Sequence, residues 1–230
     1  IKTIKKYFIN PSDSMQKNSK YKNRYNHMIK LLEDNKYKNT IHYRSKINNN
    51  HTVEIKKSIL NILNKNINDE PILILEDDIK CFKQCAKCRD ISKDDIVNIP
   101  IDCDAYYLGY HLWGMYKWSD PPVHYRSHIV SINNGEYFRF LNMLGGHSII
   151  FKNKRFKERV IKEYTKKDDR ASDVILAELM KEYNVYGIHC PKFYQCYEHN
   201  LTDKKIVCST NINYDNMVTV MLSQVKSLIN

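Results

Sequence analysis

The sequence predicts an α/β fold, with a Rossmann-like, mostly parallel central sheet flanked by helices. Two observations lead to this prediction. Apolar runs of strand length alternate with stretches of helical periodicity, and residues 72–75 are apolar without interruption. Such a run is typical of a strand buried on both faces, as in the middle of a parallel sheet. The chain has 230 residues, 42% of them apolar, and shows no linker or internal repeat. We therefore expect a single domain over 1–230.

The expected elements follow one another in the order of a doubly wound sheet. The first half gives strand, helix, strand, helix and strand at residues 5–10, 21–35, 40–44, 52–64 and 71–75. Further strands are expected at 105–110, 128–132 and 185–188, and a glycine-containing segment at 144–151 leads into another. Further helices are expected at 135–143, 155–164, 173–183 and 214–229, with Ser172 as a cap for the third of these.

The charge balance favours an anionic partner. Lys and Arg number 37 against 26 acids, a formal charge of +11, but no nucleic-acid-binding motif is present. We expect a phosphate-bearing ligand and no nucleic acid. No apolar run reaches the length of a membrane span. Seven cysteines without a secretory signal indicate a reducing compartment, so we expect a cytoplasmic protein, whose oligomeric state stays open.

Three acids, Glu76, Asp77 and Asp78, follow the buried run at 72–75. Ligands of open α/β sheets bind just outside the carboxyl ends of the strands. Three carboxylates stay ionised in a dry site only where a cation or hydrogen-bond donors compensate them. Glu76 and Asp78 would face the same way if the strand continued, and would then offer oxygen ligands to one divalent ion. The alternative is a solvated acidic turn.

Five short motifs occur in an order that resembles a known family. They are Ile9-Asn10 at the end of the first strand, Leu73–Asp78, Tyr107–Tyr110, Gly145–Phe151 and Ala171–Leu176. Together they resemble the LPS-type and collagen-galactosyl glycosyltransferases and related enzymes of large DNA viruses. That resemblance implies a GT-A fold, with a nucleotide-sugar half at about 1–110 and an acceptor half at about 111–230.

The resemblance also implies a function. The donor would be a nucleotide-diphosphate sugar, UDP favoured, and a hexosyl or deoxyhexosyl group would pass to a glycan or glycoprotein acceptor. A divalent ion, Mn²⁺ or Mg²⁺, would bind an acidic motif. If the protein is viral, its compartment would be the host cytoplasm. Carried over to this chain, the resemblance implies that Glu76 and Asp78 contact the metal ion or the ribose, with Asp77 beside them. The chain departs from the family pattern because its first acid is Glu rather than Asp.

The same resemblance assigns further candidates, each with a plain structural alternative. Asp203 is the acid that would return to the metal, with His199 as a second candidate, or it lies in a surface turn. Asp173 would be the general base for the acceptor hydroxyl, or a helix-capping residue. His147 would contact the acceptor sugar or the donor phosphate, or serve a structural role. Asn10 would contact the base or phosphate of the donor.

Other side chains carry weaker expectations. Arg24 is an alternative phosphate contact, although a solvated helix position is the expected one. Trp113, Tyr116 and Trp118 offer aromatic faces on which sugar rings stack, or belong to the core.

A cysteine cluster supports a second function. Cys81, Cys85 and Cys88 have the three-then-two spacing of radical iron–sulfur enzymes, although Lys87 stands where an aromatic residue is usual. Together with Cys103 they have the chemistry of a structural zinc site. Reduced thiols in a loop are the third possibility.

Overall fold

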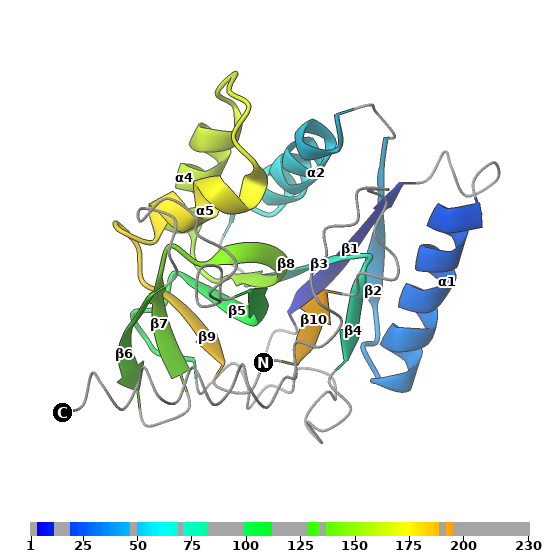
Figure 1. Cartoon of the computed structure of the whole chain (residues 1–230), viewed down its shortest axis with the longest axis horizontal. Coiled ribbons are helices and arrows are strands. Elements are labelled where there is room, and N and C mark those ends of the chain that lie inside the picture. Colours follow the sequence, from blue (N-terminus) through cyan, green and yellow to red (C-terminus); the bar gives the residue numbers. More distant parts are fainter. Residues whose placement is uncertain are drawn as a thin grey trace, which may run out of the picture.

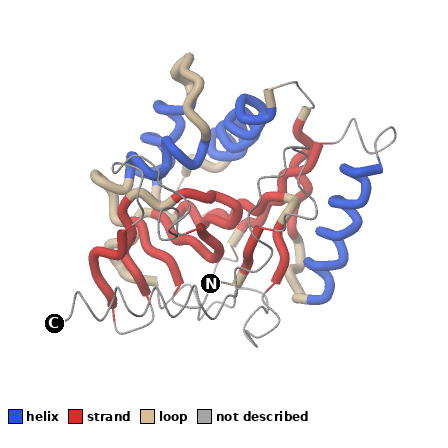
Figure 2. The backbone as a smooth tube through the Cα atoms, in the orientation of Figure 1, coloured by secondary structure: helices blue, strands red, loops and turns tan. Residues whose placement is uncertain are grey.

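An eight-stranded mixed sheet forms the centre of this computed structural model (Figures 1 and 2). The structure describes residues 4–11, 19–46, 50–68, 71–81, 99–111, 128–133, 137–188 and 192–195. The strands of the sheet are β1 (Lys5–Pro11), β2 (Thr40–Ser45), β3 (Ile72–Glu76), β5 (Ala105–His111), β6 (His128–Asn133), β7 (Tyr137–Leu141), β8 (Leu144–Phe151) and β9 (Val185–Ile188). Their spatial order is β2-β1-β3-β8-β5-β9-β7-β6.

The expectation of a mostly parallel sheet is wrong. β1 pairs in parallel with β2 and β3, and β5 with β9. However, β8 pairs antiparallel with both β3 and β5, and β7 pairs antiparallel with β6 and β9. A parallel neighbour needs a crossover connection of about a dozen residues or more. β7 runs opposite to β9 and therefore to β5, and the chain continues from β7 into β8 in the same direction, with only Asn142 and Met143 between them. A reversed strand therefore lies between β3 and β5.

Helices and a small second sheet cover the two faces of the central sheet. The helices are α1 (Ser19–Asp34), α2 (His51–Lys65), α4 (Lys154–Tyr164) and α5 (Ser172–Leu179). Figure 1 shows α2, α4 and α5 gathered on one side and α1 apart from them. The second sheet pairs β4 (Ile79–Cys81) antiparallel with β10 (Phe193–Gln195). None of the helices in the described ranges is long and apolar enough to cross a membrane.

Alternating side chains of β3 divide the core between these two faces. Ile72 and Ile74 pack in the cluster that contains the inner faces of α2, α4 and α5. Leu73 and Leu75 pack in the cluster that contains the inner face of α1 and parts of the small sheet. All four side chains are at most 3% exposed. The apolar run therefore has the two-sided burial that its sequence predicted.

Most predicted elements are confirmed within a few residues, and two are wrong. The predicted helix at 135–143 contains strand β7, because Phe138 and Phe140 face one core while Tyr137 faces the other. This is the period of a strand. The predicted helix at 173–183 ends at Leu179. The predicted helix at 214–229 lies outside the described residues.

A buried carboxylate, Asp104, joins three elements near the start of β5. Its side chain accepts hydrogen bonds from Asn153 Nδ2 at 2.5 Å, Arg155 Nη2 at 2.8 Å and the Asn184 backbone N–H at 2.8 Å. Asn153 also caps α4 by accepting from Phe156 N at 3.0 Å. Burial alone would raise the pKa of Asp104, but these hydrogen bonds hold it below the usual value.

We expect substitution of Gly109 to test the close packing of β5 on its neighbours. A Cβ at this position would lie 2.5 Å from both His147 Nε2 and the Phe193 carbonyl oxygen. Gly109→Ala should therefore lower the free energy of unfolding by roughly 2–3 kcal/mol, measured by urea denaturation. Gly146→Ala is the control, since its nearest atom would be Ile149 Cδ1, the end of a side chain, at the longer distance of 3.2 Å. Equal losses in both variants would contradict this packing.

The pH dependence of unfolding should reveal the role of Asp104. Its folded pKa lies below its unfolded value, so its ionised form stabilises the native state above about pH 4, and this stabilisation is lost as pH falls through the folded pKa. Asp104→Asn should cost roughly 1–3 kcal/mol at pH 7, and the difference from the native protein should shrink toward pH 2. Exposed Asp169→Asn is the control. A difference that does not change with pH would refute this role.

Candidate functional site

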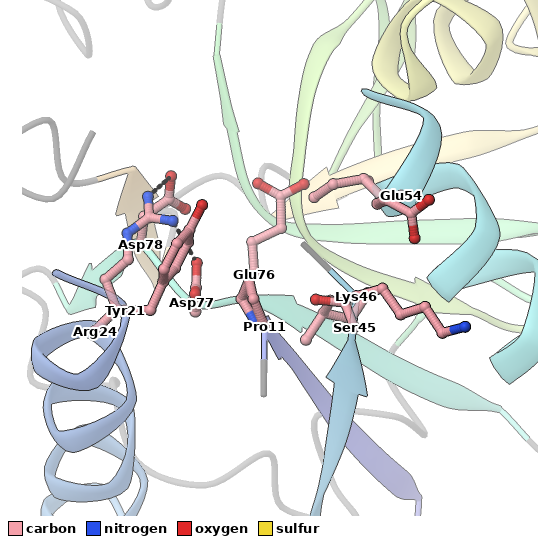
Figure 3. Close-up of a pocket in the computed structure, with 11 residues that line it drawn as sticks. Pro11, Tyr21, Arg24, Ser45, Lys46, Glu54, Glu76, Asp77 and Asp78 are labelled. Carbon is pink, nitrogen blue, oxygen red and sulfur yellow. Dashed lines mark hydrogen bonds and ion pairs between the residues drawn. The ribbon is translucent and has the colours of Figure 1, made fainter. Parts of the chain in front are cut away.

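A pocket opens at the carboxyl ends of the three parallel strands β1, β2 and β3 (Figure 3). Its walls come from these strand ends and from the first turns of α1 and α2. The lining residues are Ile9, Pro11, Tyr21, Arg24, Ser45, Lys46, Glu54, Ile55, Glu76, Asp77 and Asp78. The acidic trio therefore faces a pocket, and the alternative of a solvated acidic turn is wrong for Asp77 and Asp78, which are 6% and 5% exposed.

The topology of the sheet explains why a pocket forms here. The chain leaves β1 for α1 on one face of the sheet, and leaves the adjacent β2 for α2 on the other face. The two connections diverge and leave a crevice between them, which is the switch point where open α/β sheets bind ligands. The first turn of α2 contributes Glu54 and Ile55 to the crevice.

Arg24 and Asn10 compensate the two buried aspartates of the trio. Arg24 donates from Nη1 to Asp77 Oδ1 at 2.9 Å and from Nη2 to Asp78 Oδ2 at 3.0 Å. Asn10 donates from Nδ2 to Asp77 Oδ2 at 2.6 Å. The expectation that Arg24 is solvated is wrong: it is 3% exposed. Helical spacing places it one turn before Met28, on the buried face of α1.

Burial raises the pKa of Asp77 to about 6, although the nearby Arg24 lowers it. The neighbouring charge of Asp78 raises it further, and the hydrogen bond from Asn10 lowers it. Asn10, predicted to contact the donor, is fully buried and orients Asp77 in this structure. In this structure Asn10 therefore holds the Asp77 carboxylate in place.

Glu76 and Asp78 both line the pocket, but they do not belong to one continuous strand. Strand β3 ends at Glu76, and Asp77 and Asp78 form the turn into β4. The strand period that would align residues two apart is lost at that turn, and Figure 3 shows the Glu76 carboxylate apart from the point where Asp77 and Asp78 meet Arg24. The use of Glu76 and Asp78 as ligands of one ion stays a prediction. In the described part of the chain, no three His, Cys, Asp or Glu side chains form a potential metal site.

The electrostatic environment of Glu76 includes Asp78, Asp173 and Asp77. Burial raises the pKa of Glu76 well above its usual range, and the charges of Asp78, Asp173 and Asp77 add to this rise. Burial also raises the pKa of two tyrosines, Tyr107 and Tyr164, and the charges of Asp173 and Glu76 contribute to both shifts. The fold therefore brings Asp173 close to the acidic end of β3, from a position about a hundred residues away.

Asp173 lies in the first turn of α5. The predicted cap is wrong: Ala171 is the N-cap residue, and it makes no side-chain capping bond. Ser172 Oγ instead lies 2.6 Å from the hydroxyl oxygen of Tyr164. Asp173 Oδ1 accepts from the adjacent Val174 N–H at 2.9 Å, and its side chain is half-buried.

The remaining predicted site residues lie elsewhere or outside the described ranges. His147 is 1% exposed and does not line the pocket. Its ring packs against Gly109, which favours the structural alternative. Asp203 and His199 lie outside the described residues, as do the three aromatic candidates Trp113, Tyr116 and Trp118.

The structure describes two of the four cysteines predicted as metal ligands, Cys81 and Cys103. Cys85 and Cys88 lie outside the described residues. Cys81 is half-buried on β4, and Cys103 is 1% exposed with its thiol donating to the Ala105 carbonyl oxygen at 3.0 Å. Burial raises the pKa of Cys103 to about 12. Because two of the four cysteines lie outside the described residues, the zinc site stays a prediction.

Sequence reasoning did not identify four residues of the pocket: Tyr21, Ser45, Lys46 and Glu54. Ser45 and Lys46 directly follow the predicted second strand, and its carboxyl end was a signal that could have found them. Glu54 falls in the first turn of a predicted helix, where an acid alone indicates only a favourable interaction with the helix dipole. Tyr21 is the first residue of the predicted helix at 21–35, and a tyrosine there gives no signal for a ligand.

Cys103 should resist alkylation in the native protein. Its thiol is buried and its pKa is about 12, so almost no thiolate exists at pH 7.5. A short pulse of iodoacetamide, followed by peptide mass spectrometry, should leave Cys103 unlabelled until the protein is denatured. A chelator should not change this result, which separates burial from protection by zinc. Rapid labelling of the folded protein, or labelling induced by the chelator, would contradict the structure.

Comparison with known proteins assigns no family to this site. No protein-family model matches the chain, and no curated protein matches it at a significant level. The function of the chain is therefore inferred from the geometry of its own pocket and from the order of its sequence motifs.

Proposed function

We propose that this protein is a glycosyltransferase of GT-A type. It transfers a hexosyl or deoxyhexosyl group from a nucleotide-diphosphate sugar, with UDP favoured, to a glycan or glycoprotein acceptor. The observation that carries this proposal is the pocket at the switch point of β1 and β2, beside the acidic end of β3. The ordered motifs of the sequence support it, and Asp173, whose charge adds to the burial that raises the pKa of Glu76, would supply the base.

The chemistry of the pocket suits a nucleotide diphosphate. Lys46 is exposed at the mouth, and the N-terminal turn of α2 faces the pocket with Glu54 and Ile55. A helix N-terminus and a lysine both stabilise phosphate charge. Tyr21 offers a half-buried ring to a nucleobase, and the carboxylates accept hydrogen bonds from ribose hydroxyls.

In the proposed reaction, Asp173 accepts the proton of the acceptor hydroxyl. The hydroxyl oxygen forms a bond to the anomeric carbon while the bond from that carbon to the diphosphate oxygen breaks, and the diphosphate leaves with the electron pair. Attack opposite the leaving group inverts the anomeric centre. Tyr164 and Ser172 hold the start of α5 through their hydrogen bond, which fixes the position of the base.

The expected divalent ion does not fit the described residues as they stand. Of the predicted ligands, Glu76 lies apart from the point where Asp78 meets Arg24, and Asp78 Oδ2 is bound to Arg24. Asp203 lies outside the described ranges. The proposed reaction is therefore written without a step through a metal ion.

Donor binding is tested by a thermal-shift panel of UDP, GDP, CMP and their sugars, each with and without Mn²⁺. A ligand at a hundred times its Kd should stabilise the native state by about 2.7 kcal/mol. Lys46→Ala should weaken the binding of the responding nucleotide about tenfold, because it removes a charged phosphate contact. Lys30→Ala, on the exposed side of α1, is the charge-matched control. No shift with any nucleotide in the folded protein would refute the proposal.

Catalysis is tested at Asp173, with release of the nucleotide from the responding donor as the assay. Asp173→Asn should lower kcat by about 10²- to 10⁴-fold, while the thermal shift given by the donor changes little. Asp169→Asn is the matched control, because Asp169 is an exposed acid just before helix α5. Equal activity of the two variants would exclude Asp173 as the base.

A further inference from the structure

Two buried carboxylates and one buried guanidinium meet in the pocket. Asp77 and Asp78 are adjacent carboxylates, 6% and 5% exposed, and Arg24 between them is 3% exposed. Two buried negative charges repel each other and lose their hydration, so a cation must accompany them. In the expected glycosyltransferase site that cation is a divalent metal ion. In this structure it is a side chain of the protein.

The guanidinium engages one oxygen of each carboxylate, and so occupies the space between the two acids. Nη1 and Nη2 of Arg24 contact Asp77 Oδ1 and Asp78 Oδ2 at 2.9 and 3.0 Å. The second oxygen of Asp77 accepts from Asn10 at 2.6 Å. Metal ions such as Mg²⁺ need oxygens at about 2.0–2.1 Å. A planar guanidinium held at both ends by hydrogen bonds leaves no room for such an ion between the same two oxygens.

We infer that Arg24 is the resident counter-cation of this pocket, and that a divalent ion binds the Asp77–Asp78 pair only by displacing the Arg24 guanidinium. Arg24 thereby determines how tightly the pocket holds metal. Metal alone binds the native protein weakly, because the incoming ion must break two charged hydrogen bonds. This inference concerns the charge balance of the pocket and holds for whichever ligand the pocket takes.

The test measures Mn²⁺ alone, with no nucleotide or acceptor, on the full chain. Free Mn²⁺ is followed by its EPR signal during titration, and the melting temperature is measured in parallel. Arg24→Gln removes the competing charge and retains a polar side chain. It should bind Mn²⁺ at least about tenfold more tightly than the native protein. Mn²⁺ should also raise its melting temperature by several degrees more, since the ion replaces the lost cation.

Two further variants assign the effect to this pair. Arg24→Gln with Asp78→Asn should lose the gain in Mn²⁺ affinity, because one of the two carboxylates is gone. Arg24→Lys keeps a charge, but an ammonium cannot bridge both carboxylates as the guanidinium does. It should show a smaller gain of about threefold, and it decides the question if Arg24→Gln does not fold.

Mn²⁺ affinity in the folded Arg24 variants that equals or falls below that of the native protein would overturn the inference. A gain that persists without Asp78 would also overturn it, because the ion would then bind elsewhere. Neither result depends on sugar transfer. Failure of this inference and failure of the proposed glycosyltransferase function are therefore separate outcomes.

Discussion

The desolvation of two adjacent carboxylates at the end of β3 is the constraint on which this site depends. β3 is buried on both faces, so its carboxyl end delivers Asp77 and Asp78 into an environment with little water. Ionised carboxylates persist there only with compensation. Arg24 from α1 and Asn10 from β1 provide it, at distances of 2.6 to 3.0 Å. The first strand, the first helix and the acidic turn are therefore joined by electrostatics as well as by packing.

The end of β3 also divides the acids between a strand and a turn. Glu76 is the last strand residue, and its buried carboxyl has a pKa raised first by burial and then by the charges of Asp78, Asp173 and Asp77. Asp77 and Asp78 form the turn into β4, where both side chains meet Arg24. Within this short motif, therefore, Arg24 compensates two of the acids directly by hydrogen bonds, while the third lies apart from that contact. In the proposed reaction all three would lie beside the donor, and Asp173 would act on the acceptor hydroxyl.

The sequence predicts the local elements well because their signals are local. Two-sided burial at 72–75, the helices of the first half and helix α4 follow from periodicity and residue type. The reversed strand β8 could not be predicted, because its direction depends on strand pairing across the chain. The same limit applies to Arg24. On a helical wheel it lies among apolar residues, but the sequence does not show that two aspartates 53 and 54 positions away complete its environment.

An acidic motif in a sequence therefore predicts only part of the electrostatics of its site. A strand followed by Glu-Asp-Asp indicates where negative charge gathers, but it does not say which cation balances that charge. The balance is decided by the helix packed beside the strand, and here that helix carries an arginine on its buried face. A guanidinium and a divalent ion both neutralise carboxylates, yet they differ in the geometry of their contacts and in whether they exchange with solvent. The guanidinium is tethered, forms directional bonds near 3 Å and cannot leave with a product. A metal ion binds at shorter distance and exchanges with solvent. The identity of the residue at position 24 therefore bears on the metal dependence of the pocket as directly as the acids themselves.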